Sequence, residues 1–418
     1  MRLMAQRIAI IGSGMAGLAA AWFLGENHQV TLFERQPRLG IGAHSVLAPG
    51  GVVDVPLRVI YPGYYPELFA LLAQTGVAVE PLDAALGFSE PGEASYFRYQ
   101  NLQLLGKTLP WVSPATLRGG AARHILVDLA RFLLQAPRAL QAGQLHGRTI
   151  GAYLDAQNYS QDFSQRFLIP VFAGINTVGY QEVRDYPAHL IAQYLNRAFV
   201  AASVYRAVGG ASAIAQALSG RVHSLRLDAR IAHVKRRARS VLVTLEDGSS
   251  EAFDALVFAT QANVVLGLYR NAELRERAIL GSVRYGPVRV VMHHDERLMP
   301  ASRADWSPVN YVVSPDWDRP MVTIWVNRLL PAYAHAKPLF QTINPQREPD
   351  PQQVLQDSHL QRPLVNLQTQ GNLEALDALH AEAGRRVFFC GAYAAQGIPL
   401  LESAVASACG VARLIGPR

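Results

Sequence analysis

The first forty residues carry the clearest alternation of apolar and polar positions in the chain. Residues 8–11 form a short apolar run of mostly branched side chains, which is typical of a buried parallel strand. The glycine-rich segment 12–17 (GSGMAG) follows, and the apolar positions of residues 18–24 then recur with the period of a helix. Residues 29–33 predict a second strand, which ends at Glu34. The order is therefore strand, glycine turn, helix, strand and acid.

Each glycine of this turn has a physical role in dinucleotide binding. Gly12 permits the tight turn after the strand, Gly14 lets the backbone approach a pyrophosphate, and Gly17 lets the helix pack against the sheet. The helix N-terminus adds free N–H groups and a positive dipole end. Glu34 lies 20 residues after Gly14, where a carboxylate accepts hydrogen bonds from a ribose 2′-hydroxyl and so favours FAD or NAD over NADP. The pattern therefore predicts a dinucleotide site at Gly12, Gly14, Met15, Ala16, Gly17 and Glu34. The alternative is a glycine-rich turn that binds nothing.

The next part of the chain has a different rhythm. The pattern predicts helices over residues 67–75, 121–135, 149–155 and 163–172, and alternating strands over residues 85–89 and 95–105. Strand and helix do not alternate here as they do in a parallel α/β unit. We therefore expect an inserted domain that builds a substrate pocket. The default expectation for Tyr61, Tyr64, Tyr65, Trp306, Trp317 and Trp325 is core packing, and the alternative is that they line an aromatic pocket.

Parallel-sheet elements return after residue 205. We expect a helix over residues 211–218, strands over 230–234, 241–245 and 253–260, and a final strand and helix over 386–392 and 397–414. Residues 283–294 and 321–326 alternate as sheet strands, and the aromatic-rich segment 306–317 between them is expected to complete the same sheet. Residues 338–362 are rich in Pro and Gln and predict surface loops.

Composition limits the class of protein. The 418 residues are 50% hydrophobic and 17% charged, which suits two closely packed domains with a large core. The net charge of +7 comes from scattered arginines, and the densest basic cluster, residues 235–237, predicts a solvated turn more than a nucleic-acid site. Weak attraction to an anionic membrane surface stays open, but no transmembrane segment is expected.

Two further residue types bear on compartment and metal binding. Cys390 and Cys409 are the only cysteines, and their apolar surroundings favour reduced thiols in a cytoplasmic protein. His293 and His294 are adjacent on a predicted strand and therefore face opposite sides, so no metal site is expected.

The segment after Glu34 indicates which dinucleotide is bound. Arg35 is followed by residues 38–44 (RLGIGAH), which resemble the extended fingerprint of FAD enzymes of the amine oxidase and phytoene desaturase type. In that family the two glycines are adjacent, whereas Ile41 separates them here. The resemblance implies that FAD is the cofactor and that Arg35, Gly42, Ala43 and His44 contribute to its site.

Later segments resemble the remaining FAD motifs of this family. Residues 206–210 (RAVGG) match the turn at which the chain re-enters the FAD domain. The strand end at 259–260 and the strand-glycine segment at 390–392 match two motifs that contact the cofactor, except that Ala392 replaces the usual Asp. The helix after residue 400 would face the pyrimidine end of the flavin. The resemblance thus adds Val234, Ala259, Thr260, Gly391, Ala392, Leu400 and Leu401 to the cofactor site.

The resemblance implies a fold and a division of the chain. We expect an α/β protein with a Rossmann-like FAD-binding domain, glutathione-reductase-like and of the amine oxidase type, and an interleaved α+β substrate domain. The FAD-binding domain would comprise residues 1–54, 206–283 and 373–418, and the substrate domain residues 55–205 and 284–372. Residues 285–287 (YGP), 294–300 (HDERLMP) and 390–393 (CGAY) are most similar to predicted FAD-binding amine-oxidase-like proteins encoded beside cyclopropane fatty acid synthases.

The implied activity is that of an FAD-dependent oxidoreductase. Many amine oxidases use a lysine near the flavin N5, but Lys107, Lys235 and Lys337 are the only lysines, and Arg289 occupies the approximate place. This favours a dehydrogenase or desaturase that takes a hydride from a C–H bond of a largely apolar small molecule or acyl substrate. The alternatives are an amine oxidase that uses O₂, a non-redox isomerase or cyclase, and an FAD-binding partner without turnover. Candidate catalytic residues are Tyr393, Arg289 and His44.

Overall fold

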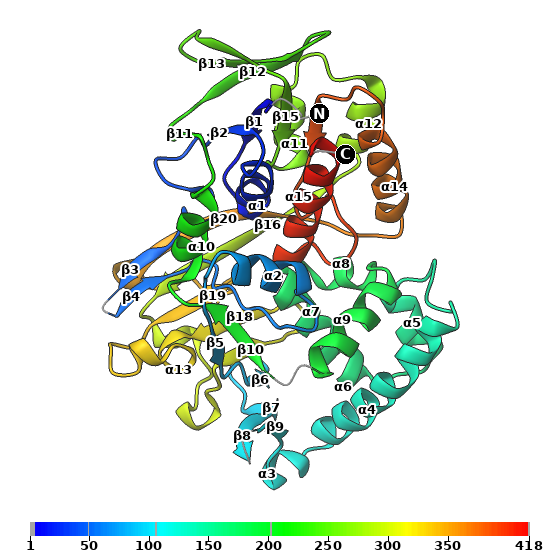
Figure 1. Ribbon diagram of the computed structural model, residues 1–418. Coiled ribbons are helices and arrows are strands. Elements are labelled where there is room, and N and C mark those ends of the chain that lie inside the picture. Colours follow the sequence, from blue (N-terminus) through cyan, green and yellow to red (C-terminus); the bar gives the residue numbers. More distant parts are fainter. Residues whose placement is uncertain (1–4, 49, 105–106, 201–202, 417–418) are drawn as a thin grey trace.

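A five-stranded parallel sheet lies at the centre of the upper half of the molecule in Figure 1. The computed structural model describes residues 5–48, 50–104, 107–200 and 203–416. The strands lie in the order β11 (Ser224–Arg226), β2 (Gln29–Phe33), β1 (Arg7–Ile11), β15 (Ala255–Phe258) and β21 (Val387–Phe389). The strands predicted at residues 8–11, 29–33, 253–260 and 386–392 are thereby confirmed.

Both faces of this sheet are covered, which is why its strands β1, β15 and β21 are apolar at every position except Arg7 at the start of β1. Ile8 and Ile10 pack into one core, and Ala9 and Ile11 into another. The first core is closed by α1 (Met15–Leu24), α10 (Gly210–Ser219) and α15 (Leu401–Ile415). The second is closed by α11 (Ala262–Leu268), α12 (Leu274–Gly281), α14 (Thr369–His380) and an antiparallel sheet of β12 (Ile231–Arg236), β13 (Val241–Leu245) and β14 (Ser250–Phe253).

A seven-stranded mixed sheet forms much of the lower half. Its order is β20 (Val354–Pro363), β16 (Tyr285–His293), β19 (Phe340–Ile343), β18 (Met321–Trp325), β17 (Val309–Val312), β6 (Leu86–Ser89) and β7 (Ser95–Arg98). Only the β6–β17 pair is parallel. Because β17 comes from residues 306–317, the prediction that this segment completes the sheet is confirmed.

Helices and small ribbons complete the lower half (Figure 1). The helices are α2 (Pro66–Gln74), α3 (Pro114–Leu117), α4 (Gly120–Gln141), α5 (Ile150–Ala156), α6 (Gln161–Phe163), α7 (Ile169–Asn176), α8 (Tyr180–Arg184), α9 (Ala188–Val200) and α13 (Val326–Leu329). The ribbons pair β3 (Val46–Ala48) with β4 (Gly51–Val53), β5 (Val79–Leu82) with β10 (Val204–Ala207), and β8 (Gln100–Leu104) with β9 (Lys107–Trp111). The predicted strand 95–105 is divided between β7 and β8, and its last residue lies outside the described residues.

The prediction of surface loops over residues 338–362 is wrong. β19 is buried at all four positions, and its two polar residues are hydrogen bonded: Thr342 to His293 of the same sheet, and Gln341 to Asp54 O and Leu57 N. β20 is an edge strand with alternately exposed side chains, and its backbone pairs with β16 over nearly its whole length. A strand held mainly by backbone hydrogen bonds needs few apolar residues, so the apolar pattern did not reveal it.

Two of the expected domain boundaries fall inside continuous elements. The boundary at 205/206 lies within β10, and the boundary at 372/373 lies within α14. We therefore propose to place these boundaries before Val204 and before Thr369, and we keep the others as predicted.

Candidate cofactor and active site

The glycine turn after β1 is built for close packing at two positions and for open space at a third. Gly12 has φ +99°, and a Cβ there would lie 3.0 Å from the Ala259 carbonyl oxygen. A Cβ at Gly17 would lie 1.8 Å from the carbonyl oxygen of Gly12. At Gly14 no atom lies within 4 Å of the position that a Cβ would take, so the turn leaves room at the start of α1.

That space lies at an uncapped helix N-terminus. Gly14 is the N-cap of α1, no side chain bonds to the cap, and no acid lies in the first turn. The first N–H groups of a helix have no partner inside the helix, and their dipole end is positive. A pyrophosphate fits this position by size and by charge.

Glu34 lies beside the same turn, as the sequence predicts. Its buried carboxylate accepts hydrogen bonds from Ser13 N (3.0 Å), Ser13 Oγ (2.5 Å) and Gln36 N (2.9 Å). Gly40 N donates to the Ser13 hydroxyl oxygen at 2.6 Å, which joins the following loop to the glycine turn. These bonds hold Glu34 in place where β2 ends.

Three remote segments meet at the carboxyl ends of the parallel strands. Ala259 and Thr260 follow β15 and contact Gly12. On the next strand, Cys390 N donates to Phe258 O at 2.9 Å, and a Cβ on Gly391 would lie 3.8 Å from Thr260 O. Ligands of open α/β sheets bind at this edge. The structure thus brings together the predicted residues Gly12, Gly14, Met15, Ala16, Gly17, Glu34, Ala259, Thr260 and Gly391.

The loop of residues 40–43 connects this edge to α10. A Cβ on Gly42 would lie 3.6 Å from Ser212 Oγ, close to the start of α10. His44 follows this loop and is half-buried. Burial lowers the pKa of His44, and the positive charges of Arg58 and Arg38 lower it further. At neutral pH the imidazole is therefore uncharged and can accept a proton or a hydrogen bond.

The N-terminus of α15 is also free of side-chain caps. Leu400 is its N-cap and Leu401 its first residue. Just before them, Ile398 N donates to the hydroxyl oxygen of Tyr64 at 2.9 Å. Tyr64 belongs to a cluster of edge-to-face rings with Tyr61, Tyr65, Tyr194 and Phe172. An aromatic wall therefore lies beside the predicted segment at Leu400 and Leu401.

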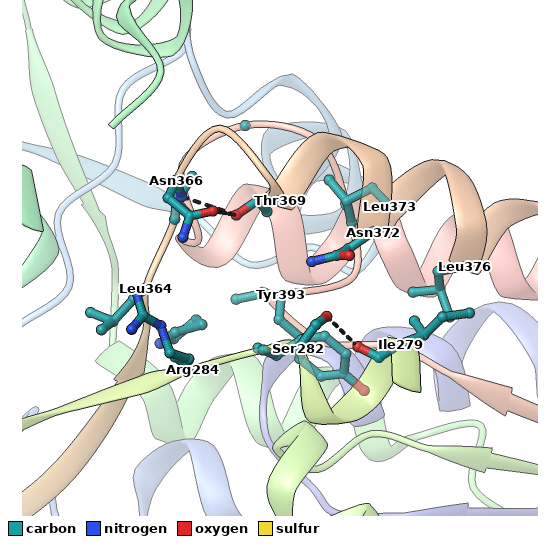
Figure 2. A pocket seen from close by; sticks show the side chains of 16 residues that line it. Ile279, Ser282, Arg284, Leu364, Asn366, Thr369, Asn372, Leu373, Leu376 and Tyr393 are labelled. Carbon is teal, nitrogen blue, oxygen red and sulfur yellow. Dashed lines mark hydrogen bonds between the residues drawn. The ribbon is translucent and has the colours of Figure 1, made fainter. Parts of the chain in front are cut away.

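Tyr393 forms part of a pocket between the two halves of the molecule. Figure 2 shows it among side chains from the end of α12, the segment after β20 and the start of α14. A Cβ on Gly391 would lie 2.8 Å from the Tyr393 ring, so the ring packs directly on the strand-glycine segment. The Tyr393 hydroxyl is buried and has no hydrogen-bond partner among the described residues, and burial raises its pKa well above the ordinary value. Ala392 lines the same pocket.

The structure gives the candidate catalytic residue Arg289 a different place. Its neighbours on β16, Val288 and Val290, are buried, so Arg289 projects from the opposite face of the strand. There it pairs with Asp357 (2.8 Å) and Glu348 (2.7 Å), and hydrogen bonds to these carboxylates raise its pKa. Its guanidinium is thus already saturated by acids.

Two predicted cofactor residues are not brought to the glycine turn. Val234 is fully buried in the second core, and its carbonyl accepts a hydrogen bond from Arg270 N at 3.0 Å. Arg35 is exposed after β2. Their roles stay predictions.

Arg58 and Arg362 are half-buried arginines that the sequence pattern did not single out. Arg58 Nη2 donates to Ile41 O at 2.6 Å, and Arg362 Nε donates to Thr177 Oγ1 at 3.0 Å. Each is one arginine among many in the chain, and nothing in its local pattern distinguishes it from a surface residue.

Several absences hold for the part of the chain that the structure describes. Within it, no helix is long and apolar enough to cross a membrane, and no three His, Cys, Asp or Glu side chains are grouped as metal ligands. Cys390 and Cys409 are free thiols.

Comparison with known proteins agrees with this geometry. The chain is similar in structure to a CLA-producing fatty acid isomerase from P. acnes (TM-score 0.70, 18% identity, 98% of this chain and 99% of that one). It is also similar to a putrescine oxidase (TM-score 0.66, 14% identity, 98% and 99%) and to cyclohexylamine oxidase from Brevibacterium oxydans (TM-score 0.64, 14% identity, 98% and 99%).

The sequence itself matches the profile of a family described as flavin containing amine oxidoreductase over residues 15–416. The α/β fold of the FAD-binding amine oxidase type and FAD as the cofactor are thereby confirmed. The chain belongs to the flavin containing amine oxidoreductase family.

Proposed function

We propose that the protein is an FAD-dependent oxidoreductase that takes a hydride from a C–H bond of a largely apolar small molecule or acyl substrate. The observation that carries this proposal is the aromatic wall at the N-terminus of α15. Tyr64 bonds to Ile398 N, and its ring packs 4.7 Å from that of Tyr194, centroid to centroid. These rings are buried in the core beside the α15 N-terminus, where they exclude water and would offer apolar contacts to a bound substrate.

The chain's own residues have defined tasks in this proposal. The N-terminus of α1 binds the pyrophosphate, and Glu34 accepts hydrogen bonds from the ribose. FAD held by these residues would supply the hydride acceptor. The tyrosines orient the substrate and keep water out. Neutral His44, directly after the loop of residues 40–43, can accept a hydrogen bond there.

An amine oxidase is a less favoured interpretation. Strand β16 carries no lysine, and Arg289, at the approximate place, is held by Asp357 and Glu348. The carboxylate beside the tyrosine cluster, that of Glu402, already accepts hydrogen bonds from Glu67 N and Leu68 N and so is not free to bind an ammonium group.

The test is an absorbance spectrum of the purified protein, followed by anaerobic addition of candidate substrates. We expect a two-band flavin spectrum that passes into the supernatant after acid precipitation, and bleaching by an apolar substrate. Protein that neither carries nor takes up FAD would contradict the proposal. Release of hydrogen peroxide in air with amines would instead support the amine oxidase.

A non-redox isomerase is the second candidate, and the similarity to a fatty acid isomerase favours it. It predicts a product isomeric with the substrate and no net consumption of an electron acceptor. Mass spectrometry of the product distinguishes the two candidates, because dehydrogenation lowers the mass by two hydrogens.

A further inference from the structure

Arg362 lies near the end of β20, where this strand passes between the two halves of the molecule. It is opposite Gly286 in the β16–β20 pair. The preceding residue, Gln361, accepts hydrogen bonds from Gln261 and Asn263, both just after the cofactor segment at Thr260. Successive side chains of a strand point to opposite faces, so Arg362 projects away from these residues and into the interior.

The Arg362 guanidinium has no acidic partner there. No carboxylate among the described residues forms an ion pair with it, and its one hydrogen bond to the protein is donated by Nε to Thr177 Oγ1. The phenols of Tyr65 and Tyr186 lie close enough to influence the pKa of Arg362, and the charge of Arg362 in turn lowers the pKa of Arg58. Burial lowers the pKa of Arg362. A half-buried cation that no acid pairs with is costly to desolvate, and a ligand with an anionic group would supply the missing partner.

Arg58 cannot be the group that neutralises Arg362, and it adds to the local positive charge. Its nearest carboxylate is that of Asp54, at 3.8 Å. That carboxylate is already held by Ala211 N (2.9 Å) and Ser45 Oγ (3.2 Å). The Asp54 carboxylate therefore pairs only loosely with Arg58, and it forms no ion pair with Arg362.

Thr177, which accepts the hydrogen bond from Arg362, is itself held in a defined conformation. Thr177 ends α7 with φ +56°, a left-handed conformation that a β-branched residue rarely adopts. Its hydroxyl donates to Asn176 O at 2.7 Å and therefore presents a lone pair to Arg362 Nε. This leaves Nη1 and Nη2 of the guanidinium without a protein acceptor among the described residues. Strain of this kind concentrates at functional sites.

The surroundings of this cation are polar at one point and aromatic beyond it. Tyr186 Oη and Asn176 Oδ1 are buried and have no hydrogen-bond partner among the described residues. Tyr65 packs on Tyr64 (ring centroids 5.5 Å apart), and Tyr64 reaches the α15 N-terminus through Ile398. A ligand with an acidic head at Arg362 and an apolar body along these rings would lie beside the segments that hold the cofactor.

We infer that Arg362 binds the carboxylate of the substrate, and that the substrate is therefore an apolar carboxylic acid. This inference rests on the proposed function and names the substrate class of that same site. The two free Nη groups of Arg362 match the two oxygens of a carboxylate, which a lysine could not match in the same way. Arg58 adds positive potential, and the tyrosines take the apolar chain.

The test measures binding to the FAD-loaded protein and needs no turnover. Decanoate, decanol and decylamine are titrated separately, and binding is followed by the change in the flavin spectrum. We expect decanoate to bind about 10- to 100-fold more tightly than decanol, because a hydrogen-bonded charge pair is lost in the alcohol. Decylamine is expected to bind more weakly still.

Variants identify the residue responsible. Arg362→Gln is expected to bring the affinity for decanoate down to that for decanol, and Arg362→Lys to retain part of the preference because it keeps the charge without the fork. Arg275→Gln, which breaks a surface pair with Glu382, is the matched control and is expected to change nothing. A wild-type protein that does not distinguish decanoate from decanol would overturn the inference, as would Arg362→Gln and Arg362→Lys proteins that keep the full preference.

Failure of the proposed function has a separate signature. If the protein does not hold FAD, or its flavin is never reduced, the proposed function fails. Decanoate binding can then still be measured by the shift in thermal midpoint, with the same comparison of variants. If FAD is bound and reduced but no carboxylate preference is found, only the inference fails.

Discussion

Gly14 and Gly17 differ in what surrounds their missing side chains, and this separates folding from cofactor binding. We expect Gly17→Ala to destabilise the apoprotein by about 1–3 kcal/mol or more, because its Cβ would overlap Gly12 O. Gly14→Ala places a Cβ in open space, and Gly14 has an ordinary φ of −67°. We expect it to leave apoprotein stability within about 0.5 kcal/mol of wild type and to lower FAD occupancy.

Urea unfolding of the apoproteins and the flavin content of the purified proteins measure the two effects. Gly410, in the interior of α15 with no atom near its missing Cβ, supplies the control substitution Gly410→Ala. Gly410→Ala should leave the FAD content unchanged. It should raise the free energy of unfolding only slightly, because alanine favours a helix more than glycine does. A Gly14→Ala protein with full FAD content would argue against a pyrophosphate at this turn.

Among single residues, the sequence predicts those whose role depends on neighbours in the sequence. Gly12, Gly14 and Glu34 are recognisable because a turn, a helix start and a strand end lie within a few residues of each. Arg289 and Arg362 could not be sorted in this way. Arg289 is paired with two acids, whereas Arg362 is paired with none. This difference depends on residues that are distant in the sequence, such as Thr177 and those of β20.

Among the elements, α2 depends on a cap supplied from α15. The Glu402 carboxylate accepts hydrogen bonds from Glu67 N and Leu68 N, both at 3.0 Å, at the start of α2. We expect Glu402→Ala to lower the free energy of unfolding by about 1–2 kcal/mol, since two N–H groups lose their partner. Glu402→Gln keeps an acceptor oxygen and should cost less. Chemical denaturation of the three proteins side by side is the measurement, and equal losses in both variants would contradict the capping role.

The strands β16, β18 and β19 share a buried polar network that makes the fold sensitive to acid. His293 Nδ1 accepts from Asp295 N (3.1 Å), and Nε2 is 2.8 Å from Thr342 Oγ1. Burial lowers the pKa of His293 to about 4. Below pH 6.5 the unfolded chain therefore gains a proton that the folded chain does not bind. The contribution of neutral His293 to the free energy of unfolding is fully present above pH 6.5 and is lost as the pH falls towards 4.

The expected loss from His293 is about 3 kcal/mol over that range. Urea unfolding between pH 7 and pH 4.5 should show it, and His293→Gln, which cannot titrate, should have a shallower dependence. His380, whose pKa burial lowers to about 3, leaves part of the slope in place. A variant with the same slope as wild type would exclude His293 as its source.

The elements found from the sequence are those that bury side chains with a regular period. β2 was predicted at its observed bounds because both faces of its sheet are covered by core. β20 was missed because its stability comes from backbone pairing with β16, and its exposed Asp357, His359 and Gln361 resemble a loop.

For the whole molecule, the cofactor site and the substrate half are joined at Asp54. Gln341 of β19 donates to the Asp54 carbonyl at 2.9 Å, while the Asp54 carboxylate accepts from Ala211 N at the start of α10. The glycine turn, Thr260 and Gly391 come from three remote stretches that meet only in the folded state. A ligand bound there stabilises all of them together, and through Asp54 it should also stabilise the seven-stranded sheet.

We expect free FAD at one hundred times its Kd to raise the free energy of unfolding of the apoprotein by about 2.7 kcal/mol. Near-ultraviolet circular dichroism and differential scanning calorimetry should then show a single transition that moves to higher temperature. Two transitions, of which FAD moves only one, would mean that the halves unfold independently and that the Asp54 junction does not couple them.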